Sequence, residues 1–276
     1  MSALPQPLMA ARDMRSSALF TKFAAFIPLN DSEAYALQSC EEETYRFGRR
    51  KTVRRQGEAA PDLFVLRSGW AFSFAVMPDG GRQILDIHFP GDLIGLSSVP
   101  FDLSVNGIGT ITQVELCPVS KANYAELFEV SPRLASALHA MAMVENAILV
   151  DRLKSIGRME ARDRLAHFFL QILSRLEMTE MGSRSEPSNV RELSIVGGRG
   201  TSSNRDSFQL PMSQELIGDA LGLSAIHVNR TLRRLEVEGH LFRDHHQMTL
   251  LNRSKLAESV NFANRYAQFT TTWLPE

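Results

Sequence analysis

Three arginines and an asparagine lie close together in residues 224–234, a stretch that contains no acidic residue. Arginine can donate two parallel hydrogen bonds to O6 and N7 of guanine, and asparagine can pair with adenine in a similar way. Asn229, Arg230, Arg233 and Arg234 therefore have side chains suited to reading base edges or binding phosphate. The competing interpretation is a surface helix with solvated arginines, and the neighbouring elements must decide between the two.

The residues around this stretch predict two short helices joined by a tight turn. Ser213 and Ser224 can each cap a helix by accepting a backbone N–H hydrogen bond. Gly222 occupies the turn, where glycine tolerates a left-handed backbone, and Gly218 is small enough for close approach of the partner helix. The inner faces are apolar at helical spacing: Leu216, Ile217, Ala220 and Leu221, then Val228, Leu232 and Leu235. This combination is typical of a helix-turn-helix.

A helix-turn-helix places its second helix in the major groove of double-stranded DNA. The residues predicted to contact DNA lie at the helix N-termini and on the outward face of the second helix: Ser213, Gln214, Ser224, Ala225, Ile226, His227, Asn229, Arg230, Arg233 and Arg234. Arg233 and Arg234 are expected at phosphate, as are Ser213 and Gln214. Residues 238–252 predict a turn and a β-hairpin, which would form a wing.

Other regions of the chain differ in pattern. Between residues 45 and 119, short runs rich in Val, Ile, Leu and Phe alternate with turn signals, which predicts an antiparallel sandwich or barrel such as a jelly roll. The predicted organisation is a flexible tail at 1–17, a β-roll domain with short helices at 18–130, a long helix at 131–157, a DNA-binding domain at 158–256 with a polar linker at 179–209, and a C-terminal tail at 257–276.

The long helix carries an apolar seam at near-heptad spacing, which is typical of a contact between two helices of a dimer. The seam residues predicted at the dimer interface are Leu134, Leu138, Met141, Glu145, Ile148 and Arg152. The alternative is that the same helix packs in the core of its own chain.

Composition narrows the remaining classes of function. The chain has 276 residues and a formal net charge of −1, and its two halves, 1–150 and 151–276, carry −3 and +2, so a nucleic-acid surface must be local. Two cysteines, Cys40 and Cys117, are too few for a disulfide scaffold or for a zinc or iron–sulfur site with four cysteines. No apolar run comes near the ~20 residues of a membrane span. The sequence therefore predicts a cytoplasmic protein with no membrane partner.

On these residues the chain resembles the Crp/Fnr family of bacterial transcription regulators. The resemblance covers about residues 20–255 and includes "GDLIGL", "RDRLAHFFLQILSRL" and, most specifically, "LPMSQELIGDALGLSAIHVNRTLRRLEVEGHL". It implies an α+β fold with a cyclic-nucleotide-binding-like β-roll, a dimerisation helix and a winged helix-turn-helix. It also implies a homodimer on a near-palindromic site, with RNA polymerase as a further partner and with no enzymatic activity.

The chain departs from the family where the family binds its effectors. The resemblance implies a ribose-binding Glu after the "GDxIG" turn, but Leu96 stands there, and the phosphate-binding Arg is absent because no arginine occurs between Arg82 and Arg133. Lys121 is the only cation in that interval. A buried cyclic phosphate would lack a guanidinium partner, so we expect an effector other than cyclic AMP, or none. An iron–sulfur cluster is likewise not expected, and no cofactor or metal is predicted.

Histidines at two places in the chain could in principle supply ligands. His88 lies in a predicted strand and could face inward as a haem ligand, but a lone histidine is more often packed or hydrogen-bonded. His245 and His246 in the predicted wing are expected to be solvated or to contact the DNA backbone. Neither position predicts a metal or haem site.

The recognition helix also departs from the family pattern. Ile226 stands where many members have a Glu, and Asn229 stands where others have Ser or Gly. Arg230 is retained, so the resemblance implies a guanine contact for it. Without the carboxylate, a contact to N4 of cytosine should be missing, and Ala225 or Ile226 could contact a thymine methyl group instead.

Three further functions remain as alternatives. The first is a small-ligand-binding or redox-responsive β-roll protein that uses its helix-turn-helix for protein interaction. Redox control would need an activated thiol, but Cys40 precedes three glutamates and Cys117 lies between Leu116 and Pro118, which favour unreactive thiols. The second, a cupin enzyme, would need clustered metal ligands, and only His88 lies in the strand region. The third is an interaction scaffold with a vestigial helix-turn-helix, which salt-dependent DNA binding would contradict.

Overall fold

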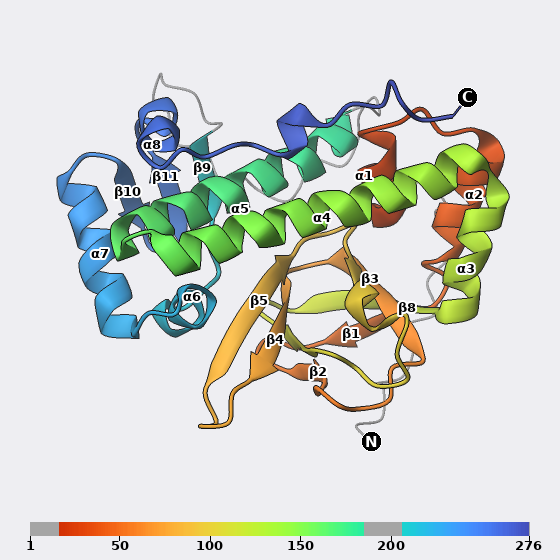
Figure 1. The fold of residues 1–276 in the computed structure, drawn as a ribbon, viewed down its shortest axis with the longest axis horizontal. Coiled ribbons are helices and arrows are strands. Elements are labelled where there is room, and N and C mark those ends of the chain that lie inside the picture. Colours follow the sequence, from red (N-terminus) through yellow and green to blue (C-terminus); the bar gives the residue numbers. More distant parts are fainter. Residues whose placement is uncertain (1–16, 185–205, 276) are drawn as a thin grey trace.

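A computed structural model describes residues 17–184 and 206–275 of the chain. Helices α1 (Ala18–Ala24) and α2 (Asp31–Ser39) precede a β-domain, which is followed by α3 (Lys121–Val130) and two long helices, α4 (Pro132–Arg158) and α5 (Ala161–Arg184). In Figure 1, α4 lies across the top of the β-domain and α5 runs beside it. The helices α1 to α3 lie at one end of this pair and the C-terminal domain at the other.

The β-domain contains two antiparallel sheets of four strands each, with strand orders β1-β8-β3-β6 and β2-β7-β4-β5. The strands are β1 (Tyr45–Phe47), β2 (Thr52–Arg54), β3 (Asp62–Ser68), β4 (Ala71–Val76), β5 (Arg82–His88), β6 (Leu93–Ile94), β7 (Gly107–Thr110) and β8 (Val114–Ser120). Phe64, Ile94 and Leu116 from the first sheet pack with Ile108 from the second. This two-sheet arrangement confirms the predicted β-roll.

The C-terminal domain combines a helix pair with a small sheet. It contains β9 (Ser207–Gln209), α6 (Gln214–Leu221), α7 (Ala225–Val237), β10 (Leu241–Asp244), β11 (Gln247–Leu250) and α8 (Arg253–Ser259). The sheet order is β10-β11-β9, and all of its pairs are antiparallel. The fold is therefore α+β, as the sequence predicted, with a β-roll, long helices and a helix-turn-helix followed by a wing.

The dimer seam predicted on α4 is contradicted by the burial of its side chains. Leu134, Leu138, Met141, Ile148 and Arg152 are at most 7% exposed within a single chain. Glu145, the remaining member, retains a side-chain exposure of 26% and contacts charged residues of its own chain. The seam therefore packs in the core of its own chain, which is the alternative that the sequence left open.

The opposite side of α4 remains exposed and apolar. Met143, Leu149, Val150 and Leu153 are 47%, 53%, 43% and 71% exposed. By length and composition, α4 is long and apolar enough to cross a membrane. This corrects the expectation that no segment of the chain would resemble a membrane span. This is weak support for a membrane span, because an interior helix of a soluble protein meets the same criteria.

Regular structure extends into the predicted linker at 179–209 from both ends. α5 continues to Arg184, and β9 pairs with β11 with Phe208 opposite Met248. The rest of the linker lies outside the described residues, as does the predicted N-terminal tail up to residue 16. Phe208 is 7% exposed because it packs against the wing. This burial explains why the mainly polar linker ends in a strand.

The predicted C-terminal tail at 257–276 also contains regular structure. α8 extends to Ser259, and a 3-10 helix, η4, spans Tyr266–Gln268. In Figure 1 this segment runs from α8 along α5 back towards α1. It therefore bridges the two ends of the molecule.

Candidate nucleic-acid interface

The turn between α6 and α7 is built as the sequence predicted. Ser213 Oγ accepts from the Leu216 amide at 3.3 Å, and Ser224 Oγ accepts from the His227 amide at 3.2 Å. Gly222 has φ of 66°, in the left-handed region that favours glycine. A Cβ atom at Gly218 would lie 2.3 Å from the Leu223 carbonyl oxygen. Gly218 thus makes room for the backbone of the turn rather than for the body of the partner helix.

The inner faces of both helices are buried. All of the predicted inward residues are at most 8% exposed: Leu216, Ile217, Ala220 and Leu221 on α6, and Val228, Leu232 and Leu235 on α7. They join a core that also contains residues of α5 and of the wing. The predicted inward residues are therefore confirmed, and this packing fixes which side of α7 faces solvent.

The start of α6 and the outward face of α7, with its cap Ser224, carry the predicted contact residues. Ser224, Ile226, His227, Arg230, Arg233 and Arg234 are exposed, and Ser213, Gln214, Ala225 and Asn229 are half-buried. Ile226 is 76% exposed, so its apolar side chain is accessible on this face. Within the described part of the chain, Arg230 and Arg233 have no ion-pair partner. This face therefore offers free guanidinium groups beside an apolar residue.

Arg234 differs from its two neighbours. Its Nε donates to Glu238 at 2.8 Å, and Glu238 also accepts from Arg162 Nε at 2.7 Å. Partial burial works against ionisation of Glu238, but the hydrogen bonds from Arg162 and Arg234 lower its pKa overall. Glu238 therefore joins the end of α7 to the start of α5. Sequence reasoning missed this pairing, because Arg162 is far from Glu238 along the chain.

The wing is a tight hairpin next to α7. Arg243 in β10 donates to both carboxylate oxygens of Glu236 in α7, at 2.7 and 2.9 Å. His245 lies at the turn with φ of 52° and contacts Asp244 at 2.7 Å. His245 and His246 are both exposed, as expected for a wing tip. Among the described residues, no group of three or more His, Cys, Asp or Glu could hold a metal ion.

A cavity of about 470 Å³ lies in the β-domain beside α4. Its lining is mainly apolar and includes Leu85, Leu93, Leu96, Leu138, Met141 and Ile148, while Lys22, Asp86, His88, Asp92, Glu145 and Arg152 add charged or polar groups. Five of the six α4 residues that were predicted at a dimer interface, all except Leu134, thus line one wall of this cavity.

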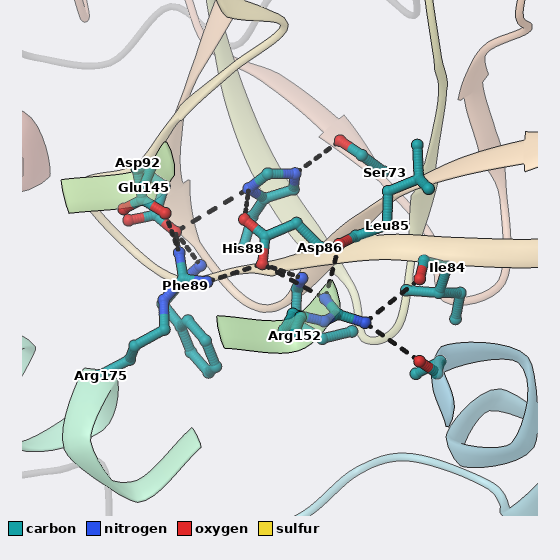
Figure 2. A network of polar contacts seen from close by, with 12 residues as sticks. Ser73, Ile84, Leu85, Asp86, His88, Phe89, Asp92, Glu145, Arg152 and Arg175 are labelled. Carbon is teal, nitrogen blue, oxygen red and sulfur yellow. Dashed lines mark hydrogen bonds and ion pairs between the residues drawn. The ribbon is translucent and has the colours of Figure 1, made fainter. Parts of the chain in front are cut away.

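Charged groups at the edge of the cavity pair with one another (Figure 2). Arg175 of α5 donates to Asp86 at 2.8 Å and to Asp92 at 2.7 Å. Lys22 lies 2.6 Å from Asp92, and Arg152 lies 3.7 Å from Asp86. Burial alone would raise the pKa of Asp92, but Lys22 and Arg175 lower it to about 2. Lys22 and Arg152, the lysine and arginine that line the cavity, therefore already face carboxylates of this chain.

His88 faces inward, as its predicted strand position allowed. Its Nε2 lies 2.7 Å from Ser73 Oγ, and its Nδ1 faces Asp86 at 3.7 Å and Asp92 at 3.9 Å (Figure 2). Burial lowers the pKa of His88 despite these carboxylates. His88 is thus a packed and hydrogen-bonded histidine.

Both cysteines are buried, and their thiols are held in the protonated form. Burial, with a smaller contribution from Glu41, raises the pKa of Cys40 to about 12. Burial likewise raises the pKa of Cys117 to about 11, although a 3.4 Å contact with Thr44 acts in the opposite direction. Of the three glutamates that follow Cys40, only Glu41 contributes to the shift. Neither thiol has the low pKa of a reactive cysteine.

The β-domain and the helix-turn-helix are in direct contact. Arg152 of α4 donates to the carbonyl oxygens of Leu85 at 2.7 Å and of Ala220, near the end of α6, at 3.2 Å. Arg82 of β5 lies 2.6 Å from Asp219 of α6. Arg152 is a charged residue at an inward position of the predicted seam, and this was the feature of the sequence that could have indicated a contact between the two domains. The same residue therefore lines the cavity and contacts α6.

Comparisons with known proteins agree with this architecture. A family model described as a Crp-like helix-turn-helix domain matches residues 163–259, and one described as a cyclic nucleotide-binding domain matches residues 45–131. The nitrogen fixation regulation protein FixK of Bradyrhizobium diazoefficiens is 27% identical over 211 residues, which are 76% of this chain and 78% of that protein. The fumarate and nitrate reduction regulatory protein of Escherichia coli is 23% identical over 239 residues, 87% of each chain. The solved structure of FixK2 from Bradyrhizobium japonicum has a TM-score of 0.60 and 26% identity, over 78% of this chain and 95% of that chain.

Proposed function

Because the chain belongs to the Crp/Fnr family of transcription regulators, we propose that it is a sequence-specific DNA-binding protein that acts as a homodimer on a near-palindromic site. Transcription regulation is the function of its relatives, and enzymatic activity is not part of this proposal. RNA polymerase is the expected protein partner, and the cytoplasm is the expected location.

The observation that carries the proposal is the exposed face of α7. A capped helix pair with a buried inner face holds Arg230 and Arg233 outward, without carboxylate partners in the described part of the chain. Free guanidinium groups on an otherwise solvated helix can bind guanine edges or phosphates. Ile226 beside them supplies an apolar group of the kind that contacts a thymine methyl group.

The homodimer is supported by the side of α4 that the chain leaves uncovered. The residues exposed there follow heptad spacing: His139, Met143, Asn146, Val150 and Leu153. A second copy of α4 could bury the apolar members, and a polar residue such as Asn146 in such a seam can set the register of the two helices. A two-fold axis through this contact would present two recognition helices to two half-sites.

The effector is proposed to differ from cyclic AMP. Leu96 lines the cavity at the position where the family resemblance implies a ribose-binding carboxylate. Lys22 and Arg152 reach the cavity from outside the interval between Arg82 and Arg133, but Lys22 faces Asp92 and Arg152 faces Asp86. A cyclic phosphate would therefore have to displace carboxylates from cations, at a large desolvation cost. We expect a ligand of this cavity to be mainly apolar, like the lining.

Selection of binding sites from random duplexes, with purified protein and no added ligand, tests the proposal. We expect enrichment of a two-fold symmetric site with half-sites about one helical turn apart. If nothing is enriched, the selection is repeated with cyclic nucleotides and with cell extract, which supply an effector. Failure under all of these conditions, together with no salt-dependent binding to duplex DNA, would contradict DNA recognition and favour a role of the helix-turn-helix in protein interaction.

A further inference from the structure

The C-terminal segment, residues 260–275, crosses from the DNA-binding domain back to the β-domain. It begins after α8, lies beyond residues 163–259 that match the helix-turn-helix family model, and ends near α1 and α2 (Figure 1). The proposed DNA contacts do not use it. It contacts α4, α5 and Phe26, which follows α1.

The middle of this segment is bound to α4 by polar contacts. Arg265 donates to both carboxylate oxygens of Asp151, at 2.7 and 3.0 Å, a bidentate geometry that fixes both side chains. Tyr266 is 6% exposed, and its hydroxyl donates to Glu145 at 3.1 Å. Burial raises the pKa of Tyr266 well above its usual value, so the hydroxyl keeps the proton that it donates.

Apolar contacts fix the segment at both of its ends. Next to α1, the Phe26 ring packs edge-on against Phe269, with ring centroids 4.8 Å apart, and Leu274 packs against the core of the α1–α3 region. At the other end, the Phe262 ring lies 5.1 Å from His167 of α5 and packs against the core that includes α7 and α8. The segment is therefore attached to both domains.

These attachments oppose rotation of one domain relative to the other. α4 and α5 meet at Met159 and Glu160, which are the natural joint between the domains. A rotation at this joint would move α8 relative to α1 and would pull Arg265 and Tyr266 away from α4. Glu145, the acceptor of the Tyr266 hydroxyl, also lines the cavity and lies 3.4 Å from Arg175 of α5.

We propose that residues 260–275 form an intramolecular strap that holds the DNA-binding domain in one orientation relative to the β-domain. The strap connects the domain that carries α7 to a wall of the cavity. A change at Glu145 would therefore alter the hydrogen bond between Tyr266 of the strap and α4. Only the consequence for DNA affinity, described below, depends on the proposed function.

Distances between two spin labels test the strap without DNA. Labels are attached to cysteines introduced as Lys51→Cys in the β-domain and His246→Cys in the wing, both exposed positions. The native cysteines are replaced by serine, and labelled chains are diluted with unlabelled chains so that only distances within one chain contribute. We expect a narrow distribution with the strap intact and a clearly broader one in Arg265→Gln/Tyr266→Phe.

Controls separate the strap from a general loss of structure. Gln268→Ala changes an exposed residue of the same segment, and Tyr35→Phe removes the hydroxyl of an exposed tyrosine. Both should retain the narrow distribution. A truncation after Ala263 should broaden the distribution at least as much as the double substitution. A double variant with the same narrow distribution as the unsubstituted protein would overturn the proposal.

Binding to paired and single half-sites provides a second readout. A domain with greater rotational freedom must be ordered when both recognition helices of a dimer bind, so the double variant should lose roughly tenfold in affinity for a two-half-site duplex. Its affinity for one half-site should be unchanged. Equal losses on both duplexes, or tighter binding to the paired site, would contradict a positioning strap. Failure of the unsubstituted protein to bind any duplex would count against the proposed function alone, because the label distances still test the strap.

Discussion

Arg230 is the side chain on which the proposed reading of DNA depends most. It is exposed, has no ion-pair partner among the described residues, and lies beside Ile226 and Asn229 on α7. Arg230→Ala should weaken binding to the selected site by about 1–3 kcal/mol per half-site and relax specificity at one base pair. Titrations with the selected duplex and with its single-base variants measure both effects.

Arg233 provides the matched comparison, because it has the same side chain on the same helix face. Arg233→Ala should weaken binding to all duplexes to a similar extent. It should also reduce the slope of log affinity against log salt by about 1, because one arginine no longer neutralises a phosphate. If Arg230→Ala behaves in this same uniform way, Arg230 contacts phosphate rather than a base.

Asp92 makes folding stability sensitive to acid. Its pKa is lowered from 3.8 to about 2 in the folded chain, so the unfolded chain takes up a proton first as the pH falls. The stabilisation is therefore complete above pH 3.8 and is lost as the pH falls towards 2. We expect this group to contribute on the order of 2 kcal/mol to the free energy of unfolding at neutral pH.

Denaturant titrations from pH 7 to pH 2 measure this contribution. Asp92→Asn should be less stable than the unsubstituted protein at pH 7, and the difference should shrink as the pH falls. Asp102→Asn, at an exposed carboxylate, should show a small and nearly constant difference. A difference for Asp92→Asn that does not change with pH would argue against ion pairing as the cause.

At the scale of elements, the turn of the helix-turn-helix depends on Gly218. A methyl group there would lie 2.3 Å from the Leu223 carbonyl oxygen, so the turn would have to move. Gly218→Ala should therefore lower the free energy of unfolding by about 1–3 kcal/mol, despite the better helix propensity of alanine. It should also weaken DNA binding, because the same turn sets the position of α7.

Gly157 near the end of α4 is the control, because a methyl group at this position would have no neighbouring atom within 4 Å. Gly157→Ala should be neutral or should raise the free energy of unfolding by up to about 1 kcal/mol. Urea titrations of both variants measure the two changes. Equal behaviour of the two variants would show that the close approach at Gly218 can relax at little cost.

At the scale of the whole molecule, the exposed side of α4 should determine the oligomeric state. Leu153→Glu places a charge in the proposed seam at a side chain that is 71% exposed in the single chain. Folding of the chain should be little affected, whereas the dimer should dissociate, because a buried charge without a partner is costly. Sedimentation at several protein concentrations, with melting curves for the fold, measures both properties.

Phe101→Glu is the matched control, since Phe101 is 54% exposed on the β-domain. This variant should keep the oligomeric state of the unsubstituted protein. A dimer that survives Leu153→Glu unchanged would place the interface elsewhere. A charge at Leu138, by contrast, should unfold the chain, because that side chain is 3% exposed.

The two domains of one chain also share a hydrophobic core. The domain boundaries predicted from the sequence did not indicate this. Phe72 and Phe89 of the β-domain belong to the same buried cluster as Leu216 and Val228 of the helix-turn-helix. Arg152 and Arg82 add polar contacts across the same junction. The position of α6 is therefore tied to the β-domain, and the strap adds a second connection.

The sequence by itself determined the features that depend on neighbouring residues. Capping by Ser213 and Ser224, the left-handed turn at Gly222 and the alternation of the β-roll all depend on local backbone preferences and side-chain period, so local patterns predicted them correctly. Only the tertiary structure decided which side of α4 is buried, because apolar residues occupy both sides at similar spacing and distant packing selects one. The same holds for the pairing of Arg175 with Asp86 and Asp92 and for the strap, since each joins residues far apart in the chain through burial and charge.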